Sequence, residues 1–339
     1  MSTTEKIRVI CRFRPLSEIE QQNKNVFVPT FSKKLNQVNF DDNSFKFNKV
    51  LTHESSQNNV HDAAASRIVQ DAINGVNGTI FAYGQTGSGK THTLEGDCSM
   101  NASLENDTIQ ISDSVEILPE DNDLPEVHLS QQSKIHENHG LIPRVVHDVF
   151  HDIKKEFEES KFGSLAEVEV EIGYYEVYNE RLFDLFDERR EKRVLTPLQS
   201  FISLTNELTN NSLTTVQKNM AEAGCFIENA TKMRFNCNSG FITPQAYFTD
   251  FINSYTDSKK LRTVRSTDQN YSSSRSHAVI QIDIKVVLGP HSPARIGRIN
   301  LVDLAGSEIV GRSVSSAQLF NKNLRVHLYR DFNQFWRKI

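Results

Sequence analysis

The sequence predicts an α/β fold, in which a mixed or mostly parallel β-sheet is flanked by helices on both faces. Three observations lead to this prediction. Several short stretches alternate apolar and polar side chains, which is the period of a β-strand. Other stretches place apolar residues three or four positions apart, as on one face of an α-helix. The two kinds of stretch follow one another along the chain, and this succession favours one sheet with helices packed against it.

The first half of the chain contributes two strands and a helix to this prediction. Apolar side chains occupy every second position of residues 7–13, which predicts a half-buried strand. Residues 58–75 carry one apolar stripe and end in Gly75, which predicts a helix with a glycine stop. The apolar run GTIFAYG (78–84) is typical of a strand that is buried on both faces.

The second half continues the succession of helices and strands. A helical stripe runs through residues 143–153, and a clearly alternating strand, VEVEIGYYEV, spans 168–177. We expect a further helix at 246–255 and two more strands at 278–287 and 298–304.

Two stretches interrupt this pattern. Residues 97–139 hold ten acidic side chains and one basic one, Lys134, and we interpret them as a solvated acidic insertion. Residues 197–223 are rich in Ser, Thr and Asn, and we interpret them as a second surface insertion. Both are longer than ordinary connections inside a compact domain.

The composition limits the classes of protein to consider. The chain has 339 residues, of which 37% are hydrophobic and 24% charged, so it can bury a full core. Its net charge of −5 argues against a generic nucleic-acid binder. The four cysteines have no metal-like spacing, and neither a signal peptide nor a membrane-spanning run is evident. We therefore expect a cytosolic protein with no membrane and no nucleic-acid partner.

One motif carries clear chemistry. The segment GQTGSGKT (84–91) fits the phosphate-loop pattern G-x-x-x-x-G-K-[ST] at every fixed position, between a predicted strand and a helix-compatible segment. Glycines let backbone N–H groups surround a phosphate, Lys90 can reach the β- and γ-phosphates, and the Thr91 hydroxyl can bind Mg²⁺. No guanine-reading N/T-K-x-D segment follows, so ATP is preferred to GTP. The predicted nucleotide-binding residues of this loop are Gly84, Gln85, Thr86, Gly87, Ser88, Gly89, Lys90 and Thr91.

Further segments share a resemblance with one family. The chain contains RVICRFRPL (8–16), the phosphate loop, NYSSSRSHAVI (270–280) and LVDLAGSE (301–308), in this order. This set resembles the kinesin motor domain, and the likeness covers residues 6–96, 140–188 and 225–311. It implies a P-loop NTPase fold, ATP and Mg²⁺ as ligands, and the microtubule as partner. The expected location is the cytoplasmic cytoskeleton.

The resemblance also implies roles for single residues. Arg12, Arg14 and Pro15 would border the adenine, with His92 stacking on its other face. Ser273 and Ser274 belong to a segment that resembles switch I and would serve the γ-phosphate, the Mg²⁺ shell and the attacking water. Without the resemblance, this serine-rich segment would be interpreted as a turn.

The segment that resembles switch II would complete the catalytic set. Asp303 would hold Mg²⁺ through water, together with Thr91 and Ser274, and the Gly306 N–H would contact the γ-phosphate. Arg275 and Glu308 would pair across the pocket. The implied reaction is in-line attack of water on the γ-phosphate, without a covalent intermediate. The implied function is that of an ATP-hydrolysing microtubule motor.

The sequence after Gly311 departs from the family. Residues 312–339 are basic and match none of the family's later elements by eye. We therefore expect a partial motor domain at 1–311, interrupted by the two insertions, followed by a divergent basic tail, with the C-terminal part of the motor fold missing. The alternative is a truncated nucleotide-binding module without motor activity. Oligomeric state, cargo and direction of movement stay open.

Overall fold

The computed structural model supports the predicted α/β class. It describes residues 7–22, 29–32, 34, 36–40, 43–97, 135–159, 166–178, 181–187, 194–195, 230–238, 243–268, 276–289 and 291–307. Among the helices of these residues, none combines the length and the apolar character needed to cross a bilayer.

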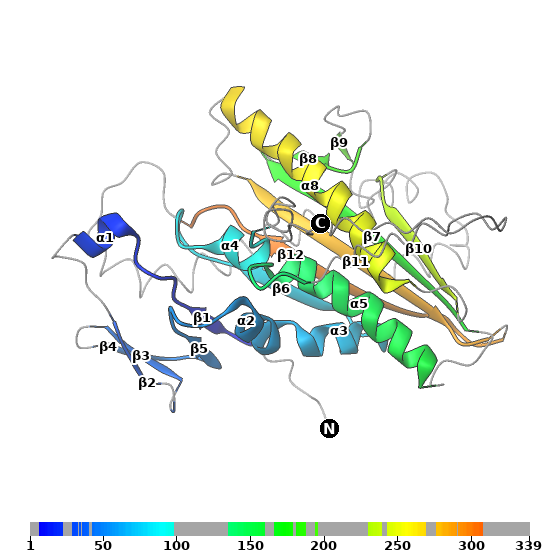
Figure 1. Ribbon diagram of the computed structural model, residues 1–339, viewed down its shortest axis with the longest axis horizontal. Helices are drawn as coiled ribbons and strands as arrows, with labels where there is room; N and C mark the ends of the chain where they lie inside the picture. The colour runs from blue at the N-terminus through cyan, green and yellow to red at the C-terminus, as the bar shows by residue number, and fades with distance from the viewer. Residues whose placement is uncertain are drawn as a thin grey trace, which may run out of the picture.

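The main sheet has seven strands in the order β6-β12-β11-β7-β8-β9, with β10 paired to β7 (Figure 1). The β6–β12 pair is parallel and the other described pairs are antiparallel, so the sheet is mixed rather than mostly parallel. A short turn explains the β11–β12 pairing, since the Ser292 N–H donates to the Gly289 carbonyl, 3.0 Å away. The strand bounds are β6 Gly78–Ala82, β7 Glu167–Tyr178, β8 Arg181–Asp184, β9 Val194–Leu195, β10 Met233–Asn238, β11 His277–Val287 and β12 Arg295–Asp303.

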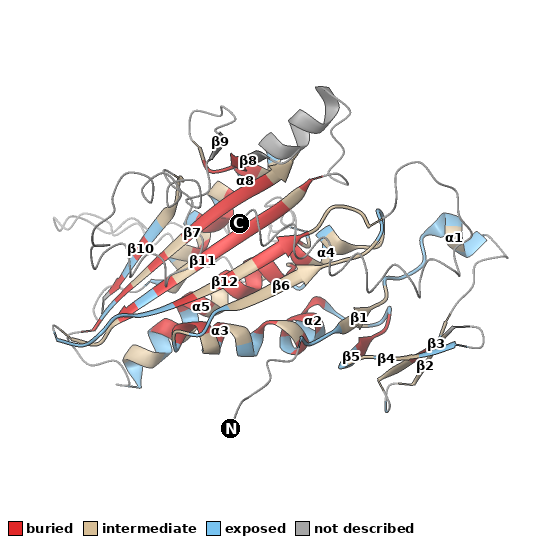
Figure 2. Cartoon of the chain, turned by 180° about the vertical axis from the view of Figure 1, so that it is seen from behind, coloured by how far each residue is buried: buried red, intermediate tan, exposed pale blue. Residues whose placement is uncertain are grey.

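One face of this sheet carries the main hydrophobic core. Helices α3 (Ser66–Ile73), α5 (Leu141–Glu158) and α8 (Pro244–Asp268) lie over it (Figure 1). The alternate residues of β7 and β11 that point to these helices are fully buried, as the red bands along the strands show in Figure 2. Phe150 of α5 contacts Phe235 edge to face, with ring centres 5.0 Å apart. The apolar side chains of the alternation at 168–172 therefore face this core, whereas Tyr174 and Tyr175, where the alternation breaks, are buried in different clusters.

The other face of the sheet combines a small apolar cluster with a chain of ion pairs. The cluster consists of Tyr175, Leu182, Val279 and Val302. Beside it, the Lys232 ammonium lies 2.7 Å from Glu171 and 3.0 Å from Asp283, and Arg298 pairs with Asp283 as well. Partly buried charges of this kind are tolerated because each one has an opposite charge within contact distance.

The N-terminal part forms two small sheets beside the main one. Strand β1 (Ile10–Arg12) pairs with β5 (Lys49–Leu51) in parallel. Strands β2 (Thr30–Ser32), β3 (Gln37–Phe40) and β4 (Asn43–Lys46) make an antiparallel sheet, and a short helix, α1 (Glu18–Gln22), precedes them. The predicted strand at 7–13 is thus shorter than expected. Its first residue, Ile7, is 77% exposed, because pairing with β5 starts only at Ile10.

Two helix predictions needed correction. The single helix expected at 58–75 is two helices, α2 (Gln57–Ala64) and α3, which meet at the fully buried Ala65. Ser56 caps α2, and its hydroxyl accepts a hydrogen bond from the Asn59 N–H. Helix α8 extends from 244 to 268, well beyond the 246–255 that its apolar stripe predicted.

The strand at 78–84 also differs from its prediction. Every residue of β6 is only partly buried, whereas the apolar run predicted burial on both faces. Among the described strands, β6 pairs with β12 alone, so one of its edges lacks a described strand neighbour. It is followed by the short helix α4 (Lys90–Leu94).

The two ends of the acidic insertion lie side by side. Gly96 and His139 form an antiparallel bridge, and the Asp97 N–H donates to the Asn138 carbonyl at 3.0 Å. Residues 98–134 fall outside the described part, as do the second insertion at 197–223 and the predicted tail at 312–339.

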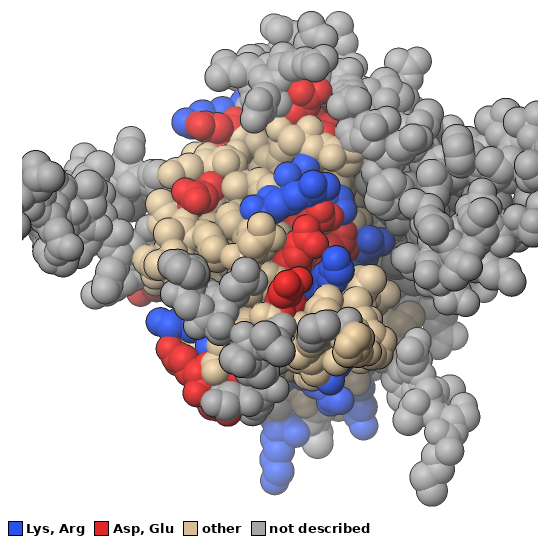
Figure 3. Space-filling view, turned by 90° about the vertical axis from the view of Figure 1, so that its right-hand side faces the viewer, with Lys and Arg blue, Asp and Glu red and all other residues tan. Residues whose placement is uncertain are grey.

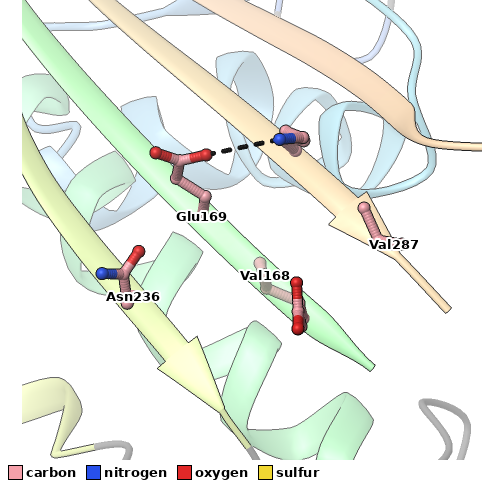
Figure 4. Close-up of a pocket in the computed structure, with 6 residues that line it drawn as sticks. Val168, Glu169, Asn236 and Val287 are labelled. Atoms are coloured by element: carbon pink, nitrogen blue, oxygen red, sulfur yellow. Dashed lines mark ion pairs between the residues drawn. The ribbon is translucent and has the colours of Figure 1, made fainter. Parts of the chain in front are cut away.

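The far end of the sheet holds a shallow pocket of about 270 Å³, lined by Glu167, Val168, Glu169, Asn236, Lys285 and Val287 (Figure 4). Lys285 and Glu169 form an ion pair across it, 3.6 Å apart. Figure 3 looks onto the right-hand end of Figure 1, where basic and acidic side chains lie next to one another. The β11 residues that line the pocket, Lys285 and Val287, lie roughly 23 to 30 Å along the strand from residue 278, at about 3.3 Å per residue. It is therefore remote from the phosphate loop.

Candidate functional site

The phosphate loop lies between the end of β6 and the start of α4. Gly84 and Gly89, the two fixed glycines of the motif, have φ angles of +158° and +94°, which side chains with a Cβ rarely adopt. A Cβ on Gly84 would also come within 2.6 Å of the Ser88 hydroxyl oxygen. The glycines are thus required by the backbone path, as the motif predicted.

The sheet register brings Asp303 to this loop. Strands β6 and β12 run parallel, with Ala82 opposite Asp303, so both strands end at the same edge. The Thr91 hydroxyl donates to the Asp303 carboxylate at 2.7 Å, and Asp303 is only 5% exposed. Lys90 lies across the loop, where its ammonium donates to the carbonyls of Gly84 and Gln85 at 2.9 and 3.0 Å.

The residues after Asp303 are held at their backbone. The Leu304 N–H donates to Ala82 O at 3.3 Å, and the Ser307 N–H donates to Gly84 O at 3.1 Å. Between them, the Ala305 N–H donates to Nδ1 of His277 at 2.9 Å. His277 belongs to the segment resembling switch I, but the resemblance implies no role for it.

The predicted adenine residues are arranged around a glutamine that the sequence prediction missed. Gln57, which is 5% exposed, accepts a hydrogen bond from Arg12 at 3.0 Å and donates to the His92 carbonyl at 2.7 Å. Arg12 also donates to the Thr93 hydroxyl at 2.9 Å. Burial and the charge of Arg12 lower the pKa of His92, which favours its neutral ring. The only signal for Gln57 in the sequence is its place just after the capping residue Ser56.

Arg14 is fixed from two sides. Its guanidinium makes two hydrogen bonds to the Glu20 carboxylate, at 2.6 and 2.7 Å, and its Nε donates to the Gly87 carbonyl of the phosphate loop at 2.9 Å. The hydrogen bond from Arg14 is the main cause that lowers the pKa of Glu20 to about 2. Pro15, beside them, is exposed.

Four predicted site residues lie outside the described part of the chain: Ser273, Ser274, Arg275 and Glu308. The predicted pair of Arg275 with Glu308 and the metal role of Ser274 therefore stay predictions. The described residues that the fold brings together are Lys90 and Thr91 with Asp303 and Gly306, and Arg12 with His92.

The family model of the kinesin motor domain matches residues 12–324. The chain belongs to the kinesin motor-domain family.

Individual kinesins show the same relationship. Kinesin heavy chain isoform 5C of Rattus norvegicus is 29% identical over 326 residues, which cover 94% of this chain and 26% of that protein. The kinesin heavy chain of Caenorhabditis elegans is 30% identical over 324 residues, covering 94% of this chain and 31% of that protein. The chain thus spans between a quarter and a third of the length of these curated relatives.

The fold comparison agrees. A solved structure of a fast kinesin superposes with a TM-score of 0.62 and 24% sequence identity, covering 95% of this chain and 70% of that one. This likeness supports the P-loop NTPase fold with a mixed sheet and flanking helices.

Proposed function

We propose that this kinesin-family chain is a motor domain that binds and hydrolyses ATP and acts on microtubules. The observation that carries the proposal is the contact of the phosphate loop with the end of β12 and the residues that follow it. The Thr91 hydroxyl donates a hydrogen bond to Asp303, and the Ser307 N–H donates one to the Gly84 carbonyl. A loop that holds phosphates and a segment able to respond to them are thereby joined within the region that matches the family.

The roles at the phosphate end follow from the residue chemistry. Lys90 neutralises charge on the β- and γ-phosphates, and the Gly306 N–H donates to the γ-phosphate. Ser273 and Ser274 orient the attacking water, and Arg275 pairs with Glu308 to close the pocket. Water forms a new P–O bond as the bond to the β–γ bridging oxygen breaks, so ADP leaves with that electron pair.

The described residues at this edge of the sheet fit Mg²⁺. A hydroxyl and a carboxylate lie in direct contact, on Thr91 and Asp303, and oxygen atoms of this kind are the ligands Mg²⁺ prefers. The described residues contain no group of three His, Cys, Asp or Glu side chains that could hold a metal by themselves. This suits an ion that keeps several waters and substrate oxygens. When bound, with Ser274 as a further ligand, Mg²⁺ supplies positive charge to the phosphate oxygens.

The base end of the nucleotide would lie against Arg12, Arg14, Pro15 and His92. Gln57 supports this assignment because it joins Arg12 to the helix that carries His92. We infer a microtubule-associated, cytoplasmic location from the family. The family match also favours the motor over a nucleotide-binding module without motor activity.

The test is steady-state ATP hydrolysis with and without microtubules. We expect microtubules to accelerate hydrolysis, and Lys90→Ala to abolish it, because removing one preorganised charge from a phosphoryl-transfer site typically costs about 100-fold or more. Lys154→Ala is the matched control, since this lysine lies on α5 and makes an exposed pair with Glu158. Turnover that is indifferent to intact microtubules would refute the motor function.

A further inference from the structure

The feature that carries a further inference is the ring of His277, the first residue of β11. In the β11–β12 register, Ala278 lies opposite Asp303, so His277 lies next to the point where β12 ends. There its Nδ1 accepts the hydrogen bond from the Ala305 N–H at 2.9 Å. The ring therefore joins the last residue of the segment resembling switch I, His277, to the segment resembling switch II.

The hydrogen bonds of residues 304–307 show what this contact does. The N–H groups of Leu304, Ala305 and Ser307 are each bound, to Ala82, His277 and Gly84 respectively. The Gly306 N–H makes no hydrogen bond to any residue in the described ranges. Gly306 thus lies between two residues whose N–H groups are hydrogen-bonded: Ala305 to the His277 ring and Ser307 to the phosphate loop.

We infer that His277 is a positioning residue that fixes Ala305 and thereby orients the Gly306 N–H toward the γ-phosphate. This inference rests on the proposed function, because it concerns the response to the same nucleotide. His277 does not touch the substrate in this account. It acts through the backbone of residues 305 and 306.

Only one of the two ring nitrogens of His277, Nδ1, makes the hydrogen bond to Ala305. An N–H donor requires a lone pair at Nδ1, so a neutral ring carries its own hydrogen on Nε2. An asparagine side chain places its oxygen close to the position of Nδ1, whereas a glutamine side chain reaches the position of Nε2. Asparagine can therefore accept from Ala305, and glutamine cannot do so without a shift of the strand.

A purely structural role predicts the opposite order. If His277 only filled space, the larger glutamine would replace the ring better than asparagine, because cavities in a packed interior are costly. The two substitutions thus separate positioning from packing.

The experiment measures the binding of ADP and of a non-hydrolysable ATP analogue to the full chain and to His277→Asn, His277→Gln and His277→Ala. The ratio of the two dissociation constants reports contacts to the γ-phosphate alone. We expect His277→Asn to keep the wild-type ratio within about 2-fold, and the other two variants to lose about 3- to 10-fold of the analogue's advantage, the value of one hydrogen bond. ADP binding should stay unchanged, and a thermal melt checks that each variant is folded.

Three outcomes overturn the inference. These are equal ratios for the asparagine and glutamine variants, a better ratio for glutamine, and an equal loss of ADP and analogue binding in all three variants. The same substitutions at His291, an exposed residue in the turn between β11 and β12, should change neither constant. A wild-type chain that binds neither ligand would instead refute the proposed function, so the two failures are distinguishable.

Discussion

At the scale of single residues, the site depends on contacts between side chains that are far apart in the sequence. Thr91 and Asp303 are 212 residues apart and meet through one hydrogen bond. Their contact follows from the parallel register of β6 and β12. Because successive side chains of a strand point to opposite faces, a slip of β12 by one residue would turn Asp303 away from the loop. The position of the Asp303 carboxylate beside Thr91 is therefore set by the register between β12 and β6.

His139, at the base of the acidic insertion, shows how burial makes one residue sensitive to pH. Burial, helped by the charges of His136 and Arg144, lowers the pKa of His139 to about 4. Its Nδ1 also accepts a hydrogen bond from the His136 N–H at 3.2 Å, which requires an unprotonated nitrogen. The folded chain thus keeps this ring neutral at a pH where an exposed histidine is charged.

We predict that His139 lowers the stability of the protein in mild acid. Between pH of about 6.5 and about 4 the unfolded chain takes up a proton that the folded chain does not, so the free energy of unfolding falls as the pH falls. The slope is at most about 1.4 kcal/mol per pH unit, and less because the ring is only half-buried. Urea unfolding at about pH 7 and about pH 5 measures it.

The variant His139→Asn isolates this effect. Asparagine keeps an acceptor for the His136 N–H but cannot take up the proton, so its stability should fall less between the two pH values. The same change at His53, an exposed residue in the turn after β5, controls for the loss of an imidazole as such. Parallel losses in wild type and His139→Asn would contradict the prediction.

At the scale of elements, the sequence predicted four of the seven strands of the main sheet, β6, β7, β11 and β12, together with its core-facing helices. The alternation at 168–177 and the stripe at 143–153 agree with β7 and α5, because in both the apolar period matches burial against one face. The extension of α8 could not be predicted from its pattern. Its last two turns read KLRTVRSTD, in which polar residues hide the helical period.

Other differences come from tertiary contacts that a local pattern does not contain. The predicted apolar stripe lies on Ala65 and α3 alone, so it carries no signal for the end of α2 at Ala64. Likewise, the phosphate loop and Asp303 were predictable as separate motifs, but Gln57 and the Nδ1 contact of His277 were not. Both depend on which elements become neighbours in space.

A partly buried ion pair joins the residue that ends helix α4 to helix α8. The Lys259 ammonium lies 2.7 Å from the carboxylate of Glu95, which is only 2% exposed. Removing one partner of a buried pair strands the other charge in a medium of low polarity. This pair links the helix after the phosphate loop to the helix that precedes the segment resembling switch I.

We predict that Lys259→Met destabilises the fold by roughly 1–3 kcal/mol, below the full value for a buried pair because the lysine side chain is one-third exposed. Lys260→Met is the control. That lysine is 71% exposed and pairs with Asp257, which is also exposed, so its loss should cost under about 0.5 kcal/mol. Equal urea midpoints for the two variants would show that the α4–α8 pair contributes nothing to stability.

At the scale of the whole molecule, the acidic insertion is attached through a closed base. Asp97 bonds to Asn138, and Arg144, which is buried, donates to the carbonyls of His136, Glu137 and His139. The start and the end of the insertion are therefore adjacent. A short linker can replace residues 98–134 without moving α4 or α5.

We predict that the acidic insertion weakens binding to the microtubule, whose surface is acidic. Replacing residues 98–134 with a short Gly/Ser linker removes eight of the ten acids at 97–139, so like-charge repulsion falls and affinity rises. Charge repulsion is screened over about 10 Å at 0.1 M salt, so the gain should shrink as salt is added.

A second variant keeps the length of the insertion but has Asn or Gln at those eight positions. If charge is the cause, this variant binds as tightly as the deletion at low salt; if bulk is the cause, only the deletion gains affinity, and its gain does not depend on salt. An affinity that neither change alters across the salt series would show that these residues do not face the filament.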